Sequence, residues 1–513
     1  MPVNSIRSPS EASSNRFELL LALLFERAHI YHPHTMRSIY VAAALVGLIG
    51  FSDAQQSFDL VIQGGRVMDP ETGLDGVRDV GILGNKVVRI SRTSLTGKRV
   101  LPAKGLVVAP GFIDLHQHGQ DLASQRVKAF DGVTTALEME IGAPDVALFL
   151  RSHAQRSLIN YGTTASHVAA RSLALGGPLP ELLPKSGAAT DQPASAEQIA
   201  RILERMRYEL DQGALGVGMG IAYTPGATRS EVIQMFRLAA ERGVPVFTHV
   251  RSAGRLEPGS SVEAVSEVIG AAAITGASLQ IVHINSSCMQ DAPECLAMIA
   301  GARARGLDIT TESYPYIPGM TYVNSAIFNP GWQQKLGISY DALQLPDTGE
   351  RLTRERFEEL HSSTKPQLVL VFSNTQEAVD GVILNPLVMI ASDGIIGHPR
   401  NAGTYSRILA HYVRQEGRLT LMDALRKMTL MPAERLERAT PSARWKGRLQ
   451  EGADADLVVF DPETITDRSS FQHPMEESAG VEYLVVNGKV LIDQGKLVPN
   501  LFPGRALVGP GKR

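Results

Sequence analysis

Residues Ser230–His249 read SEVIQMFRLAAERGVPVFTH, and this stretch decides the fold. Ser230 is a favourable N-cap, apolar residues after it recur at helical spacing, and Gly243 is a typical residue just beyond a helix end. Val244–His249 then has the apolar composition of a buried strand. The stretch therefore predicts a helix leading directly into a strand, which is half of a parallel βα repeat.

The same alternation of apolar strand runs and amphipathic helices extends along the middle of the chain. Seven more strands are predicted at residues 112–116, 133–140, 163–167, 214–220, 279–283, 307–313 and 388–393. Eight such units predict an α/β protein with a (β/α)8 barrel over residues 111–444. A ninth run at 367–372 is assigned, with the Gly- and Pro-bearing stretch before it, to an insertion at about 318–372.

Both flanks of the barrel carry short strand-like runs separated by Gly, Asp and Asn. Phe58–Ile62 opens what reads as an antiparallel unit, and Asn487-Gly488 predicts a β-hairpin near the other end. We therefore expect residues 55–110 and 445–513 to form one small β-sandwich domain built from both chain ends.

The segment 36–54 has the pattern of a secretory signal peptide. Arg37 is followed by the largely apolar run 39–51 and by Ser52-Asp53-Ala54 before Gln55. The run is short for a membrane span, although a retained anchor is the alternative. We expect residues 1–35 to be an upstream extension from a wrong start codon, and the mature chain to be periplasmic or secreted, without an integral membrane span.

Composition excludes several classes of protein. With 50 basic and 53 acidic residues in 513, the formal charge is −3, and 44% of the residues are hydrophobic, which excludes a disordered or collagen-like chain. The basic residues form no stripe, so a nucleic-acid partner is not expected. Only two cysteines are present, so any bound metal must be held by histidines and carboxylates.

Polar side chains stand where the predicted barrel strands end. His116 and His118 follow the first strand, His249 and His283 each close a later strand, and Asp393 closes the last. The carboxyl ends of barrel strands open on one face, so these residues converge. Four imidazoles and a carboxylate suit one or two divalent ions such as Zn²⁺. A lone histidine is more often structural, and we read His153, His361, His411 and His473 in that way.

Several motifs resemble the amidohydrolase superfamily, and specifically its N-acyl-D-amino-acid deacylase (D-aminoacylase) branch. They are, in order, PGFIDLHQH at 110–118, GALGVGMGIAYTPG at 213–226, THVR at 248–251, SYPY at 313–316, HPRNAGT at 398–404 and ADLVVFDP at 455–462. The resemblance covers residues 58–508. It implies a metal-dependent hydrolase that cleaves N-acyl-D-amino acids to a carboxylate and a free D-amino acid.

The chain departs from that branch at three positions. The branch usually has a metal-bridging Cys after the second strand, where this chain has Glu138 and Glu140. We expect Glu140 to be the bridging ligand because it lies nearer the active face, and Glu138 is the alternative. Asn285 stands where a Lys is expected, and Met320 where a small polar residue is expected; both positions are among those with which the family handles substrate.

The resemblance also implies roles for individual residues. Asp393 would be both a metal ligand and the base that takes the proton of the attacking water. Arg400, in the loop just after Asp393, would pair with the substrate carboxylate through two hydrogen bonds, with an exposed loop charge as the alternative. Tyr314 matches the family position that adds a hydroxyl. Its position at the end of the third predicted strand, and not the resemblance, leads us to expect that His167 donates to the scissile carbonyl or to the substrate, with a structural hydrogen bond as the equal alternative.

Two rival functions stay open on the sequence. One is hydrolysis of cyclic amides or dipeptides on the same scaffold, as in dihydroorotases, although the related carbamate-bridged enzymes need a Lys at a mid-barrel strand end and none is found at the third or fourth strand. The other is a secreted barrel that binds a metal or ligand without catalysis, which has no need for Asp393 beside the metal. The sequence assigns no oligomeric state.

Overall fold

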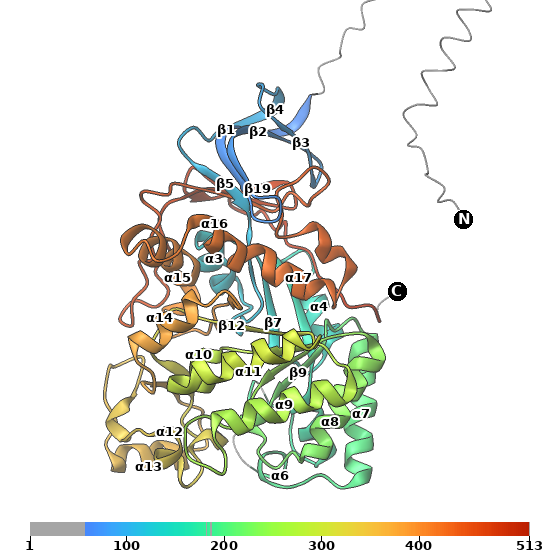
Figure 1. Ribbon diagram of the computed structural model, residues 1–513, viewed down its shortest axis with the longest axis vertical. Helices are drawn as coiled ribbons and strands as arrows, with labels where there is room; N and C mark the ends of the chain where they lie inside the picture. The colour runs from blue at the N-terminus through green and yellow to red at the C-terminus, as the bar shows by residue number, and fades with distance from the viewer. Residues whose placement is uncertain (1–56, 181, 185–186, 512–513) are drawn as a thin grey trace, which may run out of the picture. The chain divides into compact units, whose positions relative to one another are not determined.

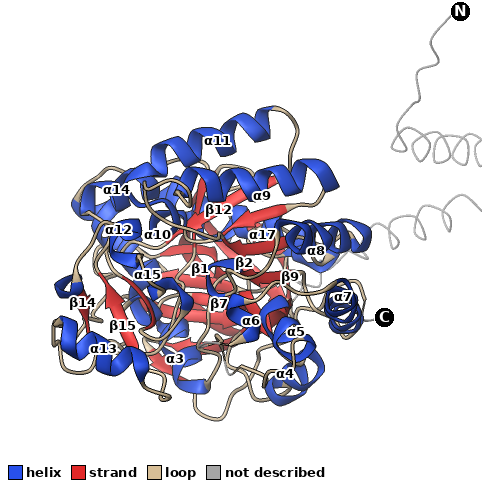
Figure 2. Cartoon of the chain, turned by 90° about the horizontal axis from the view of Figure 1, so that it is seen from below, coloured by secondary structure: helices blue, strands red, loops and turns tan. Residues whose placement is uncertain are grey.

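Eight parallel strands form the centre of the chain, as the sequence predicts (Figures 1 and 2). They are β6 (Phe112–Asp114), β7 (Val133–Ala143), β8 (Asn160–Ser166), β9 (Val217–Gly220), β10 (Val246–His249), β11 (Leu279–Ile281), β12 (Ile309–Ser313) and β16 (Val388–Ile390). Each pairs with the next in chain order, so the sheet curves into a barrel. The computed structural model describes residues 57–180, 182–184 and 187–511; the predicted leader and upstream extension lie outside these residues.

The barrel closes between its first and last strands only beyond their ends. Gln117 and Gly394 form a parallel bridge, in which His118 N donates to Gly394 O at 2.9 Å and Gly394 N donates to His116 O at 3.2 Å. A Cβ on Gly394 would lie 2.0 Å from Oε1 of Gln117, so a larger residue there would displace the side chain of Gln117. The seam of the barrel therefore lies next to the predicted site residues.

Helices surround the strands, as Figure 2 shows in blue around red. Those between or after barrel strands are α3 (Leu122–Phe130), α4 (Val146–His153), α5 (His167–Ala174), α6 (Ala188–Asp191), α7 (Ala196–Asp211), α8 (Arg229–Arg242), α9 (Ser261–Thr275), α10 (Ile284–Cys288), α11 (Ala292–Ala304), α14 (Gln376–Leu384), α15 (Arg400–Arg407), α16 (Leu421–Leu425) and α17 (Met431–Glu437). Within the described residues, no helix is both long and apolar enough to cross a membrane.

Helix α8 shows how local sequence sets these elements. Its N-cap is Thr228, whose side chain accepts from Glu231 N, so the expectation that Ser230 is the N-cap is wrong by two residues. A threonine also caps well, and propensity alone does not choose between the two hydroxyls. Gly243 ends the helix at φ 65° as expected, because that left-handed conformation is least costly for glycine.

The two chain ends meet in one β domain, which confirms the predicted architecture. Its strands are β1 (Phe58–Asp69), β2 (Leu74–Leu83), β3 (Lys86–Ser91), β4 (Gly97–Pro102), β5 (Val107–Pro110), β17 (Leu457–Phe460), β18 (Val481–Val486), β19 (Lys489–Asp493) and β20 (Lys496–Leu497). Strand β5 joins the two halves by pairing with both β1 and β17. The N-terminal half is mixed and not purely antiparallel, because β4 and β5 return parallel to β1.

A separate small sheet lies between β12 and β16 in the chain. It consists of the antiparallel strands β13 (Gly319–Tyr322), β15 (Leu368–Val371) and β14 (Leu343–Gln344), with helices α12 (Trp332–Leu336) and α13 (Arg354–Ser362) between them. Phe328, Trp332 and Phe357 pack in a core of their own. This segment, called the insertion below, borders the cavity at the barrel mouth.

Candidate metal centre

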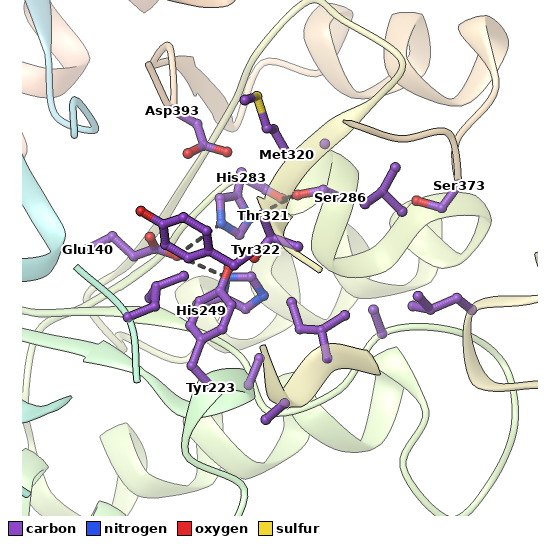
Figure 3. Close-up of a pocket in the computed structure, with 18 of the residues that line it drawn as sticks. Glu140, Tyr223, His249, His283, Ser286, Met320, Thr321, Tyr322, Ser373 and Asp393 are labelled. Carbon is purple, nitrogen blue, oxygen red and sulfur yellow. Dashed lines mark hydrogen bonds and ion pairs between the residues drawn. The ribbon is translucent and has the colours of Figure 1, made fainter. Parts of the chain in front are cut away.

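Six side chains from five barrel strands converge at the carboxyl ends of the strands. They are His116 and His118 after β6, Glu140 in β7, His249 at the end of β10, His283 after β11 and Asp393 after β16. Figure 3 shows Glu140, His249, His283 and Asp393 around the cavity. The structure thus brings together all six residues for which the sequence suggests metal binding. It also assigns them to overlapping groups, each able to hold one ion.

The first group consists of His116, His118 and Glu140, and a carboxylate oxygen of Asp393 lies beside its two histidines. Nε2 of His116 lies 3.2 Å from Nε2 of His118, 3.2 Å from Oε2 of Glu140 and 3.3 Å from Oδ1 of Asp393. Nε2 of His118 lies 3.3 Å from each of the same two carboxylate oxygens. In a tetrahedral zinc site with bonds of about 2.0 Å, neighbouring ligand atoms lie about 3.3 Å apart. These donors therefore fit a zinc-sized ion.

The second group shares Glu140 with the first. Oε1 of Glu140 lies 2.9 Å from Nδ1 of His249 and 3.1 Å from Nε2 of His283. Three protein ligands with one position left for water or substrate are typical of a catalytic zinc ion. Because the two oxygens of Glu140 face different histidine pairs, this carboxylate can bridge two ions.

The structure distinguishes the two glutamates of β7. Glu138 lies on the same side of the strand as Glu140, but its Oε2 is 2.7 Å from Nδ1 of His118, and its Oε1 accepts the N–H groups of Ile141 and Gly142. Glu138 thus fixes the ring whose other nitrogen faces the first group. Glu140 is the carboxylate placed between the histidine pairs.

Further side chains hold the remaining histidines in position. Nδ1 of His116 lies 2.7 Å from Oε1 of Glu312, and the other oxygen of Glu312 accepts from Gln280 at 2.8 Å. Nδ1 of His283 lies near the hydroxyls of Ser286 and Ser287. Such partners fix the ring orientation of metal-binding histidines. Sequence reasoning missed Glu312, whose only signal is a charged residue inside a buried strand.

The electrostatics of the cluster favour a cation. Burial acts to lower the pKa of His116, but the carboxylates of Asp393 and Glu140 outweigh it and raise that pKa to about 10. Burial acts to raise the pKa of Glu140, yet His116, His118 and His249 hold it well below its usual value. The carboxylates are therefore ionised, and a metal ion can replace the protons that they attract.

Two of the candidate metal ligands have strained backbone conformations. Asp393 has φ 49° and His283 has φ 29°, a region that residues other than glycine seldom adopt. Strain of this kind persists where surrounding contacts hold a residue in place, and it is concentrated at functional sites. Both residues come directly after barrel strands, where the chain turns to aim the side chain at the cluster.

Arg400 lies against Asp393 and not alone in a surface loop. It begins α15, 1% of its side chain is exposed, and its Nη2 is 2.8 Å from Oδ2 of Asp393. Its guanidinium carbon lies 4.5 Å from the ring centre of Tyr314. The Nε and Nη1 atoms are buried and form no hydrogen bond within the described residues. Arg400 thus has N–H groups that no described group accepts, but it is buried and is not among the residues that line the cavity described below.

His167 is not brought into the cluster. Strand β8 ends at Ser166, and His167 is the first residue of α5, where its Nε2 lies 2.9 Å from Oε1 of Glu231. Both side chains are fully buried, and Arg171 pairs with the other oxygen of Glu231. The expected substrate contact of His167 therefore gives way to its alternative, a structural hydrogen bond.

A cavity of about 280 Å³ opens above the cluster. Its inner wall includes the candidate metal ligands His118, Glu140, His249, His283 and Asp393, together with Tyr223 and Tyr314. Its outer wall includes Met320, Ile327, Leu336, Leu368 and Val371 of the insertion. Tyr314, one of the predicted substrate residues, thus borders the space in which a substrate would lie.

Comparisons with known proteins agree on one group. Two family models, both described as "Amidohydrolase family", match residues 107–280 and 350–492. N-acyl-D-glutamate deacylase of Alcaligenes xylosoxydans xylosoxydans is 32% identical and covers 88% of this chain and 97% of that protein. D-aminoacylase of the same organism is 28% identical and covers 84% and 94%. The solved N-acyl-D-glutamate deacylase from Bordetella bronchiseptica, in complex with zinc and a phosphonate inhibitor, is 25% identical with a TM-score of 0.75 and covers 88% of this chain and 100% of that chain.

Proposed function

The chain belongs to the D-aminoacylase family of amidohydrolases, and from this membership we propose that it hydrolyses N-acyl-D-amino acids to a carboxylate and a free D-amino acid. It is a metal-dependent hydrolase that acts on linear amides. The observation that carries the choice of substrate is Arg400, whose buried guanidinium beside Asp393 has unpartnered N–H groups. An α-carboxylate is the anion that such a fork binds best.

The residues for the metal are those of the two groups described above. His249, His283 and Glu140 would hold one ion, and His116, His118, Asp393 and Glu140 would hold or complete the other. When bound, a divalent ion such as Zn²⁺ lowers the pKa of water toward about 7 and polarises the scissile carbonyl. The zinc in the Bordetella bronchiseptica relative supports zinc as the ion here.

Asp393 is the residue that we propose to move the proton. Its carboxylate takes a proton from the attacking water and delivers it to the amide nitrogen as the C–N bond breaks. For this it must be ionised in the resting protein. Burial acts to raise its pKa, but Arg400 and His116 hold that pKa well below the usual range, so the base is ready at neutral pH.

The contacts of Arg400 with Asp393 and Tyr314 also support an orientation for the bound substrate. With the α-carboxylate held by Arg400 and the hydroxyl of Tyr314, the amide carbonyl would face the cluster and the rest of the substrate would extend toward the outer wall of the cavity. Cyclic-amide hydrolysis is the second candidate. It has less support, because the bridging position is held by Glu140 and because a cyclic amide that carries no carboxylate would leave Nε and Nη1 of Arg400 without a hydrogen-bond acceptor.

The test combines metal analysis with a substrate screen. Purified protein should contain one or two divalent ions per chain and should hydrolyse N-acetyl or N-formyl D-amino acids faster than the L-isomers. Dihydropyrimidines, hydantoins and dipeptides form the comparison set. Turnover of a cyclic amide with no turnover of any N-acyl-amino acid would favour the second candidate. Bound metal with no turnover in either set would favour a binding protein.

We further propose that the chain is exported. Arg37, the apolar run 39–51 and Ser52-Asp53-Ala54 support this proposal. N-terminal sequencing of protein from the native host should give Gln55 as the first residue, in a periplasmic or secreted fraction. An intact residue 1 in the cytosolic fraction would refute it.

A further inference from the structure

The hydrogen-bond ladder of the barrel has a gap between its first and last strands. Within the described residues, β6 and β16 share no paired residues, and the bridge between Gln117 and Gly394 joins the two sides only beyond their ends. Backbone N–H groups buried at such a gap lack the carbonyl of a neighbouring strand as an acceptor. His116 and Asp393, two candidate metal ligands, follow these strands. The contacts across the gap therefore decide how these two ligands face each other.

Asp114, the last residue of β6, supplies acceptors at this gap. Its Oδ1 accepts the N–H groups of His116 at 3.2 Å and of Ser392 at 3.0 Å. Its Oδ2 accepts the hydroxyl of Ser392 at 2.5 Å. One carboxylate therefore binds both sides of the seam. On one side it holds a candidate metal ligand, and on the other it holds the residue directly before Asp393.

Lys128, in α3, balances the charge of that carboxylate. Its Nζ lies 2.8 Å from Oδ2 of Asp114, and both side chains are fully buried. Within the described residues, Lys128 forms no other ion pair. A buried charge without a partner is costly, so the lysine makes a charged Asp114 tolerable at this place. Hydrogen bonds to a charged acceptor are stronger than those between neutral groups, which favours a firm hold on Ser392.

Asp114 can act on the metal centre only through the backbone. It belongs to none of the described groups that could hold an ion. Nε2 of His116 lies 3.3 Å from Oδ1 of Asp393, and both atoms must keep this spacing to bind one ion. Asp393 is also held at φ 49°, a strained conformation that needs its neighbours fixed. A shift of one side of the seam against the other would move the two ligands apart.

We propose that Asp114, paired with Lys128, is a positioning residue that holds His116 and Asp393 across the seam for the ion between them, called the seam ion below. This inference rests on the metal centre of the proposed function and deepens the description of that same site. It concerns metal affinity and not the choice of substrate.

The second group of ligands provides an internal contrast. His249 and His283 follow β10 and β11, which are joined by a regular backbone ladder from Val246 to Thr248. Their spacing therefore needs no side chain that replaces a strand partner. We expect changes at Asp114 to weaken the seam ion and to leave the ion at His249 and His283 nearly unaffected.

Two double variants separate the acceptors of Asp114 from its charge. Asp114→Ala with Lys128→Met removes both charges and all the acceptors. Asp114→Asn with Lys128→Met also removes both charges but keeps one oxygen for the two N–H groups. We expect the alanine variant to bind the seam ion about 10–100-fold more weakly than wild type, and the asparagine variant to stay within about fivefold. Competition with a chromogenic chelator gives the dissociation constants for Zn²⁺.

His118→Ala identifies the seam ion, because the dissociation constant that this variant raises belongs to that ion. The alanine double variant should raise the same constant and leave the other within about threefold. Lys446 and Asp456 are a matched control, since they are also buried, with Nζ and Oδ2 2.6 Å apart, and neither contacts a candidate ligand. Asp456→Ala with Lys446→Met should lower the melting temperature and leave both constants within about threefold.

Ser392→Ala removes one contact of Asp114 without removing a charge, and it should weaken the seam ion at least threefold. It decides the question if melting curves show that the alanine double variant does not fold. An unchanged seam constant in the folded alanine variant overturns the proposal, and so does equal weakening of both ions or equal weakening in the alanine and asparagine variants. Bound zinc that is insensitive to His118→Ala would mean that no seam ion exists, which also overturns it.

Failure of the deacylase function would be seen separately. If the wild-type protein hydrolyses no N-acyl-amino acid, that function is refuted. The dissociation constants are measured without turnover, so they still decide the role of Asp114.

Discussion

Asp393 and Arg400 form a buried ion pair, with Oδ2 and Nη2 2.8 Å apart, directly beside the metal-binding cluster. The other carboxylate oxygen of Asp393 faces His116 and His118. The residue proposed to move the proton is therefore tied to the residue proposed to bind the substrate carboxylate. If both proposals hold, substrate binding and the charge state of the base are coupled through this one contact.

Replacement of Arg400 tests that coupling. Arg400→Lys keeps the charge but loses the planar fork, so we expect KM to rise and kcat to fall as well, with kcat/KM about 10–100-fold lower. The sequence alone predicts mainly a rise in KM. The contact between Arg400 and Asp393 is the reason that we also expect kcat to fall. Steady-state kinetics measure both. Arg407→Lys, in the same helix but paired with Asp467, is the control and should stay within about threefold.

Unchanged kcat/KM in Arg400→Lys would show that the substrate carboxylate is bound elsewhere. The substrate assignment would then move toward cyclic amides.

Replacement of Glu140 tests the bridging assignment. Glu140→Gln removes the charge shared by the two groups of ligands, so bound metal should fall by at least one ion per chain and kcat by orders of magnitude. Metal content is measured by elemental analysis beside kinetics. Glu138→Gln should leave more metal bound, because Glu138 contacts Nδ1 of His118, the nitrogen that faces away from the first group, and backbone N–H groups. If Glu138→Gln loses more metal than Glu140→Gln, the assignment of the two glutamates is reversed.

Glu312 offers a test of ring orientation without contact to substrate. Glu312→Gln should weaken metal binding about 10–100-fold, since the partner of Nδ1 of His116 loses its charge. KM measured at saturating metal should remain within about twofold. Competition with a chromogenic chelator gives the metal affinity. A raised KM with unchanged metal affinity would place Glu312 in substrate binding instead.

Metal removal should affect both activity and stability. Dialysis against a strong chelator should abolish turnover, and added Zn²⁺ should restore it. An ion that binds only the folded chain adds about 2.7 kcal/mol to the free energy of unfolding at a free concentration 100 times its Kd. The melting temperature should therefore rise by several degrees on reloading. Full activity after verified removal of metal would contradict the proposed chemistry.

The buried side chain of Lys427, which lies away from the metal centre, leads us to expect that the free energy of unfolding depends on pH. Its Nζ donates to Val388 O at 2.8 Å and also to Asn385 O, and burial lowers its pKa to about 8. The unfolded chain keeps this proton until about pH 10.4. Between the two values the unfolded state binds more protons, so the contribution of Lys427 to the free energy of unfolding rises with pH.

Thermal denaturation of wild type and Lys427→Met at pH 7.5 and 9.5 checks this effect. The stability of wild type relative to the variant should increase at the higher pH. Parallel pH curves would mean that Lys427 does not release its proton in the folded chain.

The sequence predicted the barrel and the six converging side chains because both depend on local periodicity and on a rule of barrel geometry. It did not predict which side chains contact the second ring nitrogen of these histidines. Glu138 and Glu140 share a strand face, so alternation alone does not separate them, and Glu312 meets His116 only in the closed barrel. His167 does not face the metal-binding cluster, because its side chain contacts Glu231 of α8. Glu231 lies far along the chain, so the sequence around His167 does not predict this contact.

The N-terminal β unit shows the same limit. Hairpin signals identify β2 and β3 as antiparallel neighbours, but no local signal tells that β4 and β5 return to the free edge of β1. Helix starts are similarly ambiguous where two capping residues stand close together, as Thr228 and Ser230 do.

The seam between β6 and β16 has a consequence for the synthesis of the chain. His118 and Asp393 lie on opposite sides of this seam, and backbone hydrogen bonds join its two sides at Gly394. The ribosome synthesises His116 and His118 long before Asp393. In a nascent chain these two histidines therefore lack the carboxylate that lies beside them in the folded barrel. The ligand set that includes Asp393 is therefore complete only after the final strand docks. For a chain that crosses a membrane unfolded, the metal would be acquired at the destination, and the ion supply of that compartment would decide which metal the enzyme uses.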